Sequence, residues 1–239
     1  GVDRKTLLEQ LHKQKRRPGV REALFIAMEV CSALSYAHEL RDEQGAALHI
    51  VHRDISPPNV MLTKDGEVKL ADFGLAKATT QLEATDPGVV KGKFGYLSPE
   101  AAQGLEVDAR ADLFSVGIIL WEALAGQRLF LGETDYQTVK NVQRAEIPSL
   151  RALRSEVDAD LEALVQRMLA KERDERFQSA HEMRDAIATY LHEHELEVST
   201  SDLSHVVRYA VTRREREARR ARPSDVVEGN HAEQDVAVH

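Results

Sequence analysis

The segment at residues 51–74, VHRDISPPNVMLTKDGEVKLADFG, limits the possible folds of this chain more than any other stretch. Residues 60–63 and 67–71 within it alternate apolar and polar side chains, which is the pattern of short half-exposed strands. The intervening tripeptide at 64–66, Lys-Asp-Gly, has the composition of a tight hairpin turn. The segment therefore predicts a small antiparallel hairpin rather than part of a large sheet.

Three oxygen-bearing side chains flank this predicted hairpin. Asp54 and Asn59 precede it, and Asp72 follows it. A hydroxyl that attacks a phosphoryl group needs a proton acceptor beside it and a cation on the transferring oxygens. Mg²⁺ prefers oxygen ligands and keeps several waters, so a carboxylate and an amide suffice to hold it. Taken alone, Asp and Asn five residues apart would also fit ordinary turn chemistry.

Helical periodicity dominates the rest of the chain. Apolar side chains recur at helical spacing over residues 3–15, 20–40, 98–104, 109–125, 134–144, 158–170 and 179–194. Residues 40–49 are polar and predict a turn or small hairpin, whereas 75–96 predict one long loop. We expect a mainly α fold without a conventional sheet domain.

Composition narrows the class of protein. The net charge of −8 over 239 residues indicates a globular protein and disfavours one that coats nucleic acid, so no nucleic-acid partner is expected. The single cysteine, Cys31, cannot form an internal disulfide, which fits a reducing compartment. No apolar run approaches the roughly 20 residues that span a bilayer, and no signal peptide is present. We expect a cytoplasmic protein with no membrane segment in these residues.

Five motifs in one order resemble the eukaryotic-type protein kinases, specifically bacterial serine/threonine protein kinases. HRDISPPN (52–59) is similar to their catalytic loop, and DFG (72–74) is similar to their magnesium-binding motif. YLSPE (96–100) is similar to the end of their activation segment, and KERDERFQS (171–179) to the segment that pairs with that end. DLFSVGIILWEALAG (112–126) is similar to the central helix of their C-terminal lobe. Isolated, each motif would be weak evidence. Together they imply a mainly α domain that corresponds to the C-terminal lobe of the kinase fold, with short β-hairpins at the catalytic and metal-binding loops. The kinase superfamily as a whole is of the α+β class.

The resemblance implies a role for each matching residue. Asp54 would accept the substrate proton, while Asn59 and Asp72 would hold Mg²⁺, with ATP resting on Asp72 and on Met61 under the adenine. The structural positions would be His52 stacked with Phe73, Gly74 of the DFG motif, Asp112 beneath the catalytic loop, and Arg176 paired with Glu100. Arg53 would have a regulatory role, because it would bind a phosphate carried by Thr79, Thr80 or Thr85 of the activation loop.

Two positions depart from the family pattern. Most serine/threonine kinases have a lysine two residues after the catalytic aspartate, where this chain has Ser56. They have a threonine near the end of the activation segment, where this chain has Lys93. We interpret the pair as an exchange that keeps one positive charge in the catalytic site; the alternative is a solvated Lys93 and a weakened site. Pro57 fits serine/threonine specificity, and the alanine- and arginine-bearing loop of tyrosine kinases is missing.

The family's glycine-rich loop, strand lysine and helix glutamate have no counterpart here, since no Gly-x-Gly-x-x-Gly occurs in the sequence. We therefore expect residues 1–194 to be a partial kinase domain, a C-lobe that needs an N-lobe of the same polypeptide as well as ATP and a protein substrate. Residues 195–239 would be a charged tail, partly helical or disordered, whose arginines are solvated or bind a partner. The fragment alone would be inactive; the alternatives are a pseudokinase-like binding module and a truncated relic.

Overall fold

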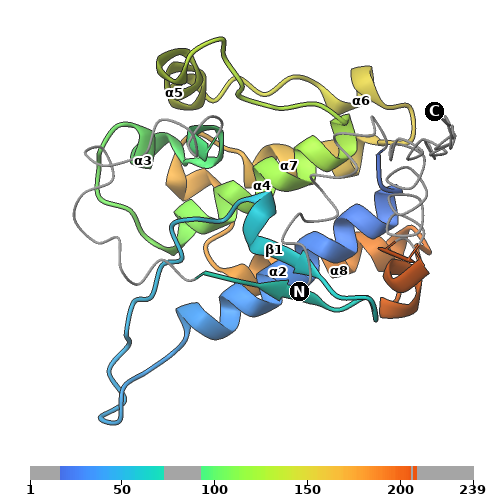
Figure 1. Cartoon of the computed structure of the whole chain (residues 1–239), viewed down its shortest axis with the longest axis horizontal. Coiled ribbons are helices and arrows are strands. Elements are labelled where there is room, and N and C mark those ends of the chain that lie inside the picture. Colours follow the sequence, from blue (N-terminus) through green and yellow to red (C-terminus); the bar gives the residue numbers. More distant parts are fainter. Residues whose placement is uncertain (1–16, 73–92, 206, 209–239) are drawn as a thin grey trace, which may run out of the picture.

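The computed structural model describes residues 17–72, 93–205, 207 and 208 (Figure 1). The elements in chain order are α2 (Val20–His38), η1 (Pro57–Asn59), β1 (Val60–Leu62), β2 (Val68–Leu70), η2 (Lys93–Tyr96), α3 (Pro99–Ala102), α4 (Ala109–Ala125), α5 (Asp135–Arg144), α6 (Leu150–Leu153), α7 (Ala159–Met168), η3 (Arg173–Glu175) and α8 (Ala180–Glu193). The mainly α fold predicted from the sequence is confirmed, and one two-stranded sheet is present in the part described.

Helix α4 forms the centre of the core. Every residue of α4 from position 111 to 125 is buried, as expected for a helix that is apolar on all sides. The Asp108 side chain caps its N-terminus by accepting from the Arg110 N–H, and Gly126 ends it in the left-handed region at φ 72°. A Cβ at Gly117 would lie 2.9 Å from the Met168 Cβ, so this glycine lets α7 approach closely.

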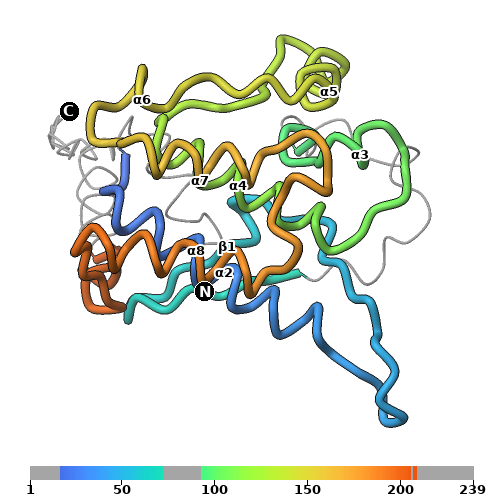
Figure 2. The backbone as a smooth tube through the Cα atoms, turned by 180° about the vertical axis from the view of Figure 1, so that it is seen from behind, coloured from blue at the N-terminus to red at the C-terminus, as the bar shows by residue number. Residues whose placement is uncertain are grey.

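The other long helices surround α4. Helix α2 packs against both α4 and α8, and α7 packs against α4 and α8. Figure 2 shows α7 and α8 across the face opposite to that seen in Figure 1. Over the part of the chain that the structure describes, no helix combines the length and the apolar character needed to cross a bilayer.

The predicted hairpin is present and lies on α2. Strands β1 and β2 pair antiparallel in a register that sets Val60 opposite Leu70 and Leu62 opposite Val68, and β2 contacts α2. The turn between them closes through a bond from the Gly66 N–H to the Thr63 oxygen at 3.1 Å. Strand β1 is one residue shorter and strand β2 two residues shorter than their alternating patterns predict.

A second, smaller hairpin follows α2 and projects from the body (Figure 1). It contains one isolated bridge, Arg41 to Ala47, and the Asp42 carboxylate accepts from two backbone N–H groups inside it, those of Gln44 and Ala46. Its residues 41–49 are all exposed. The turn or small hairpin predicted over this stretch is therefore a local structure that packs little against the core.

Packed structure continues beyond α8. Leu203 is fully buried in the core cluster, and Leu196 and Val198 pack partly against it. Arg21 of α2 holds this segment by donating to the Glu197 oxygen and pairing with Asp202 at 3.6 Å. The division into a lobe ending at 194 and a tail thereafter stays a prediction, since the arginine-rich stretch beyond 208 lies outside the described residues.

We predict that Gly66→Ala destabilises the protein far more than Gly45→Ala. Both glycines have φ near 85°, so both substitutions carry the same left-handed strain of about 1 kcal/mol. A Cβ at Gly66 would also lie 1.8 Å from the Thr200 oxygen and 2.8 Å from the Ser204 nitrogen, whereas nothing lies within 4 Å at Gly45. Urea unfolding of the two variants measures the difference, and equal losses would show that the segment after α8 does not dock on this turn.

Candidate functional site

The backbone of Ala71 joins the catalytic-loop segment to the segment that carries Asp72. The Ala71 N–H donates to the Asn59 oxygen at 2.9 Å, and the Ala71 oxygen accepts from the His52 ring Nε2 at 3.1 Å. The His52 Nδ1 accepts from the Asp54 N–H at 3.3 Å, which assigns the proton of a neutral ring to Nε2. These bonds set Asp72, the next residue, beside the loop that carries Asp54 and Asn59.

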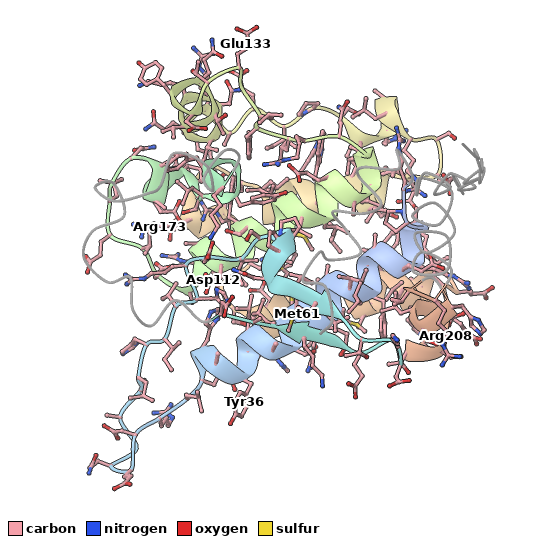
Figure 3. The ribbon with its side chains drawn as sticks, viewed as in Figure 1. Tyr36, Met61, Asp112, Glu133, Arg173 and Arg208 are labelled. Carbon is pink, nitrogen blue, oxygen red and sulfur yellow. The ribbon has the colours of Figure 1, made fainter. Side chains whose placement is uncertain are left out.

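Asp112, at the start of α4, holds the catalytic loop from below. Its buried carboxylate accepts from the His52 N–H at 2.8 Å, from the Arg53 N–H at 2.9 Å and from the His38 ring at 2.9 Å. Arg53 has φ 64°, a left-handed conformation that costs a non-glycine residue about 1–3 kcal/mol. The fixed acceptor in α4 therefore stabilises a strained loop, and Figure 3 shows Asp112 beside that loop.

His38 is a member of this cluster that sequence analysis missed. It is the last residue of α2, and its ring approaches the Asp112 carboxylate with only 10% of its side chain exposed. Its position at a helix end gave no signal by itself, because a histidine there is favourable for the helix dipole alone. Only the packing of α2 on α4 brings it to Asp112.

Asp54 lies at the surface of the loop and meets Lys93. The Lys93 Nζ donates to both carboxylate oxygens of Asp54, at 2.9 and 3.3 Å. The side chain of Asp54 is 20% exposed and that of Lys93 is 42% exposed. The exposed fractions leave this pair open to a ligand, in contrast to the buried carboxylate of Asp112. Lys93 thus reaches the catalytic loop from the activation-segment side, 39 residues along the chain.

Asn59 and Asp72 are the predicted ligands of a divalent cation, and their surroundings show what each could offer. The Asn59 Nδ2 donates to the Asp54 backbone oxygen at 2.7 Å, which leaves the amide Oδ1 as an acceptor for a cation. Asp72 is exposed and has φ 58°. Among the described residues there is no cluster of three or more histidine, cysteine or acidic side chains fit for a metal. One amide and one carboxylate fit Mg²⁺, which keeps several waters and binds phosphate oxygens.

Two of the remaining predicted site positions lie in the described part of the chain, and five lie outside it. Met61 on β1 is 40% exposed, so an apolar side chain is available at the surface of the hairpin (Figure 3). Ser56 is buried, and among the described residues no partner is seen for its hydroxyl. Five predicted positions lie outside the described residues: Phe73, Gly74, Thr79, Thr80 and Thr85.

A buried ion pair fixes the end of the activation segment. The Arg176 guanidinium forms two bonds to the Glu100 carboxylate at 2.8 and 2.9 Å, as the resemblance implies. Its other N–H groups donate to the backbone oxygens of Ala170, Lys171 and Arg110. All five donors are therefore satisfied, which offsets the cost of burying the charge.

A second network, centred on Glu122 of α4, was not predicted from the sequence. The Tyr96 hydroxyl donates to the buried Glu122 carboxylate at 2.7 Å, and Arg128 donates to the same carboxylate at 2.9 Å. The Arg128 guanidinium also lies 4.6 Å from the centre of the Tyr96 ring. This network fixes η2, which carries Lys93, against the core.

Comparison with known protein families gives the site its context. The chain matches the protein kinase domain over residues 2–188. It belongs to the protein kinase family. The resemblance predicted from five motifs is confirmed, and the fold described above is that of a kinase.

Individual kinases match over most of this chain. It is 39% identical over 194 residues to "Tyrosine-protein kinase MasK" of Myxococcus xanthus, covering 81% of this chain and 30% of that protein. It is 38% identical over 185 residues to "Probable serine/threonine-protein kinase SCO3848" of Streptomyces coelicolor, covering 77% and 26%. It is 38% identical over 167 residues to "Serine/threonine-protein kinase PknB" of Mycolicibacterium smegmatis, covering 69% and 25%. The chain thus spans less than a third of these relatives.

We predict that Arg176→Met costs about 3–5 kcal/mol of unfolding free energy, because Glu100 is left buried without its partner. The matched control is Arg184→Met on α8, whose pair with Asp185 is exposed and should contribute no more than about 1 kcal/mol. Urea unfolding at neutral pH measures both. Similar losses in the two variants would contradict a structural role for the Glu100 pair.

We also predict a pH dependence that Glu100→Gln removes. Burial is the largest single influence on Glu100 and opposes its charge, but the hydrogen bond and the positive charge of Arg176, with smaller hydrogen bonds from the backbone and Ser98, together hold the pKa of the carboxyl below its usual value. Its stabilisation is therefore complete above the unfolded-state pKa of about 4.3 and is lost as the pH falls through the lower folded-state pKa. The stability gap between wild type and Glu100→Gln should shrink on acidification in urea titrations from pH 7 to 3; a constant gap would contradict it.

Proposed function

We propose that this chain supplies the catalytic half of a kinase that transfers the γ-phosphoryl group of ATP to a serine or threonine hydroxyl of a protein substrate. The observation that carries the proposal is the double hydrogen bonding of Ala71, which holds the segment of Asp72 against the loop of Asp54 and Asn59. This arrangement supports the proposal, in which Asp54 would be the proton acceptor and Asn59 and Asp72 the oxygen donors for a cation.

In the proposed reaction the substrate hydroxyl oxygen forms a bond to the γ-phosphorus of ATP. The bond between the γ-phosphorus and the oxygen that leaves with ADP breaks. ADP departs with the electron pair of that bond, and Asp54 accepts the hydroxyl proton. Asn59 and Asp72 would hold Mg²⁺, which when bound neutralises charge on the phosphate oxygens. Met61 would lie under the adenine. Asp112 keeps the loop in the strained conformation from which Asp54 acts.

The class of acceptor hydroxyl has two candidates. Serine/threonine specificity is favoured by Pro57 in the catalytic loop and by the names of the Streptomyces and Mycolicibacterium relatives. Tyrosine specificity is favoured by the name of the Myxococcus relative and by Ser56, which replaces the lysine usual in serine/threonine kinases. We take serine/threonine as the principal candidate because the loop lacks the alanine and arginine of tyrosine kinases.

The nucleotide needs groups that these 239 residues do not contain. No glycine-rich loop of the kinase type occurs in the sequence, and each lost phosphate-binding group of this kind costs about 10²–10³ in rate. We infer that an N-lobe from the same polypeptide completes the site and that residues 1–239 alone transfer phosphate negligibly. A pseudokinase-like binding module or a truncated relic is the rival, and a scaffold has no need for Asp54, Asn59 and Asp72.

Dependence on ATP and a cysteine free of internal disulfides favour a cytoplasmic location.

The test is phosphoryl transfer by the full-length gene product that carries these residues. Asp54→Asn should lower kcat by about 10²–10⁴-fold through loss of the proton acceptor, and Asp72→Asn should lower it at least as much at low Mg²⁺. Asp65→Asn in the exposed hairpin turn is the matched control and should leave kcat unchanged.

Phosphoamino acid analysis of the product decides between serine/threonine and tyrosine. Asp54→Asn and Asp72→Asn variants that both match the Asp65→Asn control would refute the catalytic assignment. Ready phosphorylation by residues 1–239 alone would refute the need for an N-lobe and leave the rest intact.

A further inference from the structure

Of the two departures from the kinase pattern, Lys93 contacts the Asp54 carboxylate, and Ser56 lies two residues after Asp54. We propose that Lys93 is a catalytic residue that supplies the positive charge usually carried by the family's lysine two residues after the proton acceptor, with the Ser56 hydroxyl as a second donor to the same ligand. The inference rests on the proposed kinase function and adds to it the source of charge at the transferring phosphoryl group. It assigns to η2 a part in the reaction itself.

The contact between Lys93 and Asp54 is the geometric basis of the proposal. The ammonium lies within hydrogen-bond distance of both carboxylate oxygens, at 2.9 and 3.3 Å. An ammonium has three donors, so Lys93 can keep a bond to Asp54 and still donate to a phosphoryl oxygen. Its side chain is 42% exposed, which leaves room for such a ligand. A lysine at position 56 would approach the same carboxylate from within the catalytic loop.

Stability does not explain this ion pair. Pairs with partners this exposed contribute little to folding, because water screens the charges and the lysine side chain loses freedom. The structural pairs of this molecule look different: Arg176 and Glu100 are buried with side-chain exposures of 0% and 5%. A half-exposed lysine held on the proton acceptor fits a role in binding charge that arrives with the substrate.

Ser56 gives an independent observation. It is 2% exposed, and its hydroxyl is a buried polar atom for which the described part of the chain shows no partner. A buried hydroxyl without a hydrogen bond is costly, and under the proposal a ligand oxygen would accept from it. Ser56 lies two residues from Asp54, in the position from which the family's lysine acts.

Neighbouring contacts hold Lys93 in place for this role. Residues 93–96 form the short helix η2, and its last residue, Tyr96, is bonded through its hydroxyl to buried Glu122 of α4. The Tyr96 backbone oxygen accepts from the Ser115 hydroxyl at 2.7 Å. Two bonds to the buried central helix thus fix the segment from which the ammonium reaches Asp54. Preorganised charge of this kind accelerates a reaction because it needs no rearrangement in the transition state.

The kinetic test uses the full-length gene product with saturating ATP. Lys93→Ala should lower kcat by about 10²–10³-fold with a change in the KM for the protein substrate of less than about threefold. Lys93→Arg, which keeps the charge, should retain at least about a tenth of kcat. The exposed Lys140→Ala on α5 is the matched control and should match wild type. The exchange variant Ser56→Lys/Lys93→Thr should recover most of the loss seen in Lys93→Thr alone.

A second measurement does not depend on turnover. An acyl phosphate of ATP transfers its acyl group to an amine near the γ-phosphate, forming an amide and releasing ATP. Mass spectrometry should find the label on Lys93, suppressed by excess ATP, and at position 56 in the exchange variant. Lys140 should carry label that ATP does not suppress.

The outcomes separate the two proposals. Lys93→Ala with kcat within threefold of the control, or no ATP-sensitive label on Lys93, would overturn the role of Lys93 and leave the kinase function standing. Label on Lys93 without phosphoryl transfer by wild type would support its place at the phosphate and refute the proposed function.

Discussion

The site of this protein depends on one buried carboxylate at the start of the central helix. Asp112 is 1% exposed and accepts from the backbone of His52 and Arg53 and from the ring of His38. A buried carboxylate must have its acceptors filled, and here the donors that fill them are the backbone groups of a strained loop. Core packing of α4 thereby fixes the position of a surface loop, and the conformation around Asp54 follows from it.

Charged groups in this fold divide by burial into two kinds. Arg176 and Glu100, like Asp112, are buried with every strong bond satisfied, and they connect segments to α4 and to each other. Asp54, Lys93 and Asp72 retain exposed surface, and Lys93 reaches Asp54 from η2. The buried charged groups stabilise the core and the segments that carry the partly exposed charged groups. Under the proposed function Asp54 would accept a proton and Asp72 would bind a cation, so both carboxylates would have to stay accessible, unlike those of the first kind.

Much of the fold could be predicted because strong local patterns agreed with the tertiary structure. The apolar run at 109–125 became α4 with the predicted bounds, and the Lys-Asp-Gly turn became the β1–β2 hairpin. The short elements α6 and η3 were missed, since so few residues carry little periodicity, whereas the equally short α3 lies inside the predicted helical range 98–104. The burial of Leu203 after α8 gave no signal in the sequence, because packing of that segment near the Gly66 turn depends on contacts far apart in sequence.

The sequence by itself determined the family and the identity of the chemical groups, because order and spacing of motifs are properties of the chain. It also raised the exchange of serine and lysine at 56 and 93. Only the tertiary structure decided which groups meet: Lys93 with Asp54, His38 with Asp112, and Tyr96 with Glu122. These pairs are 26–74 residues apart along the chain. Their distances are set by how helices pack around α4, and no local pattern encodes that packing.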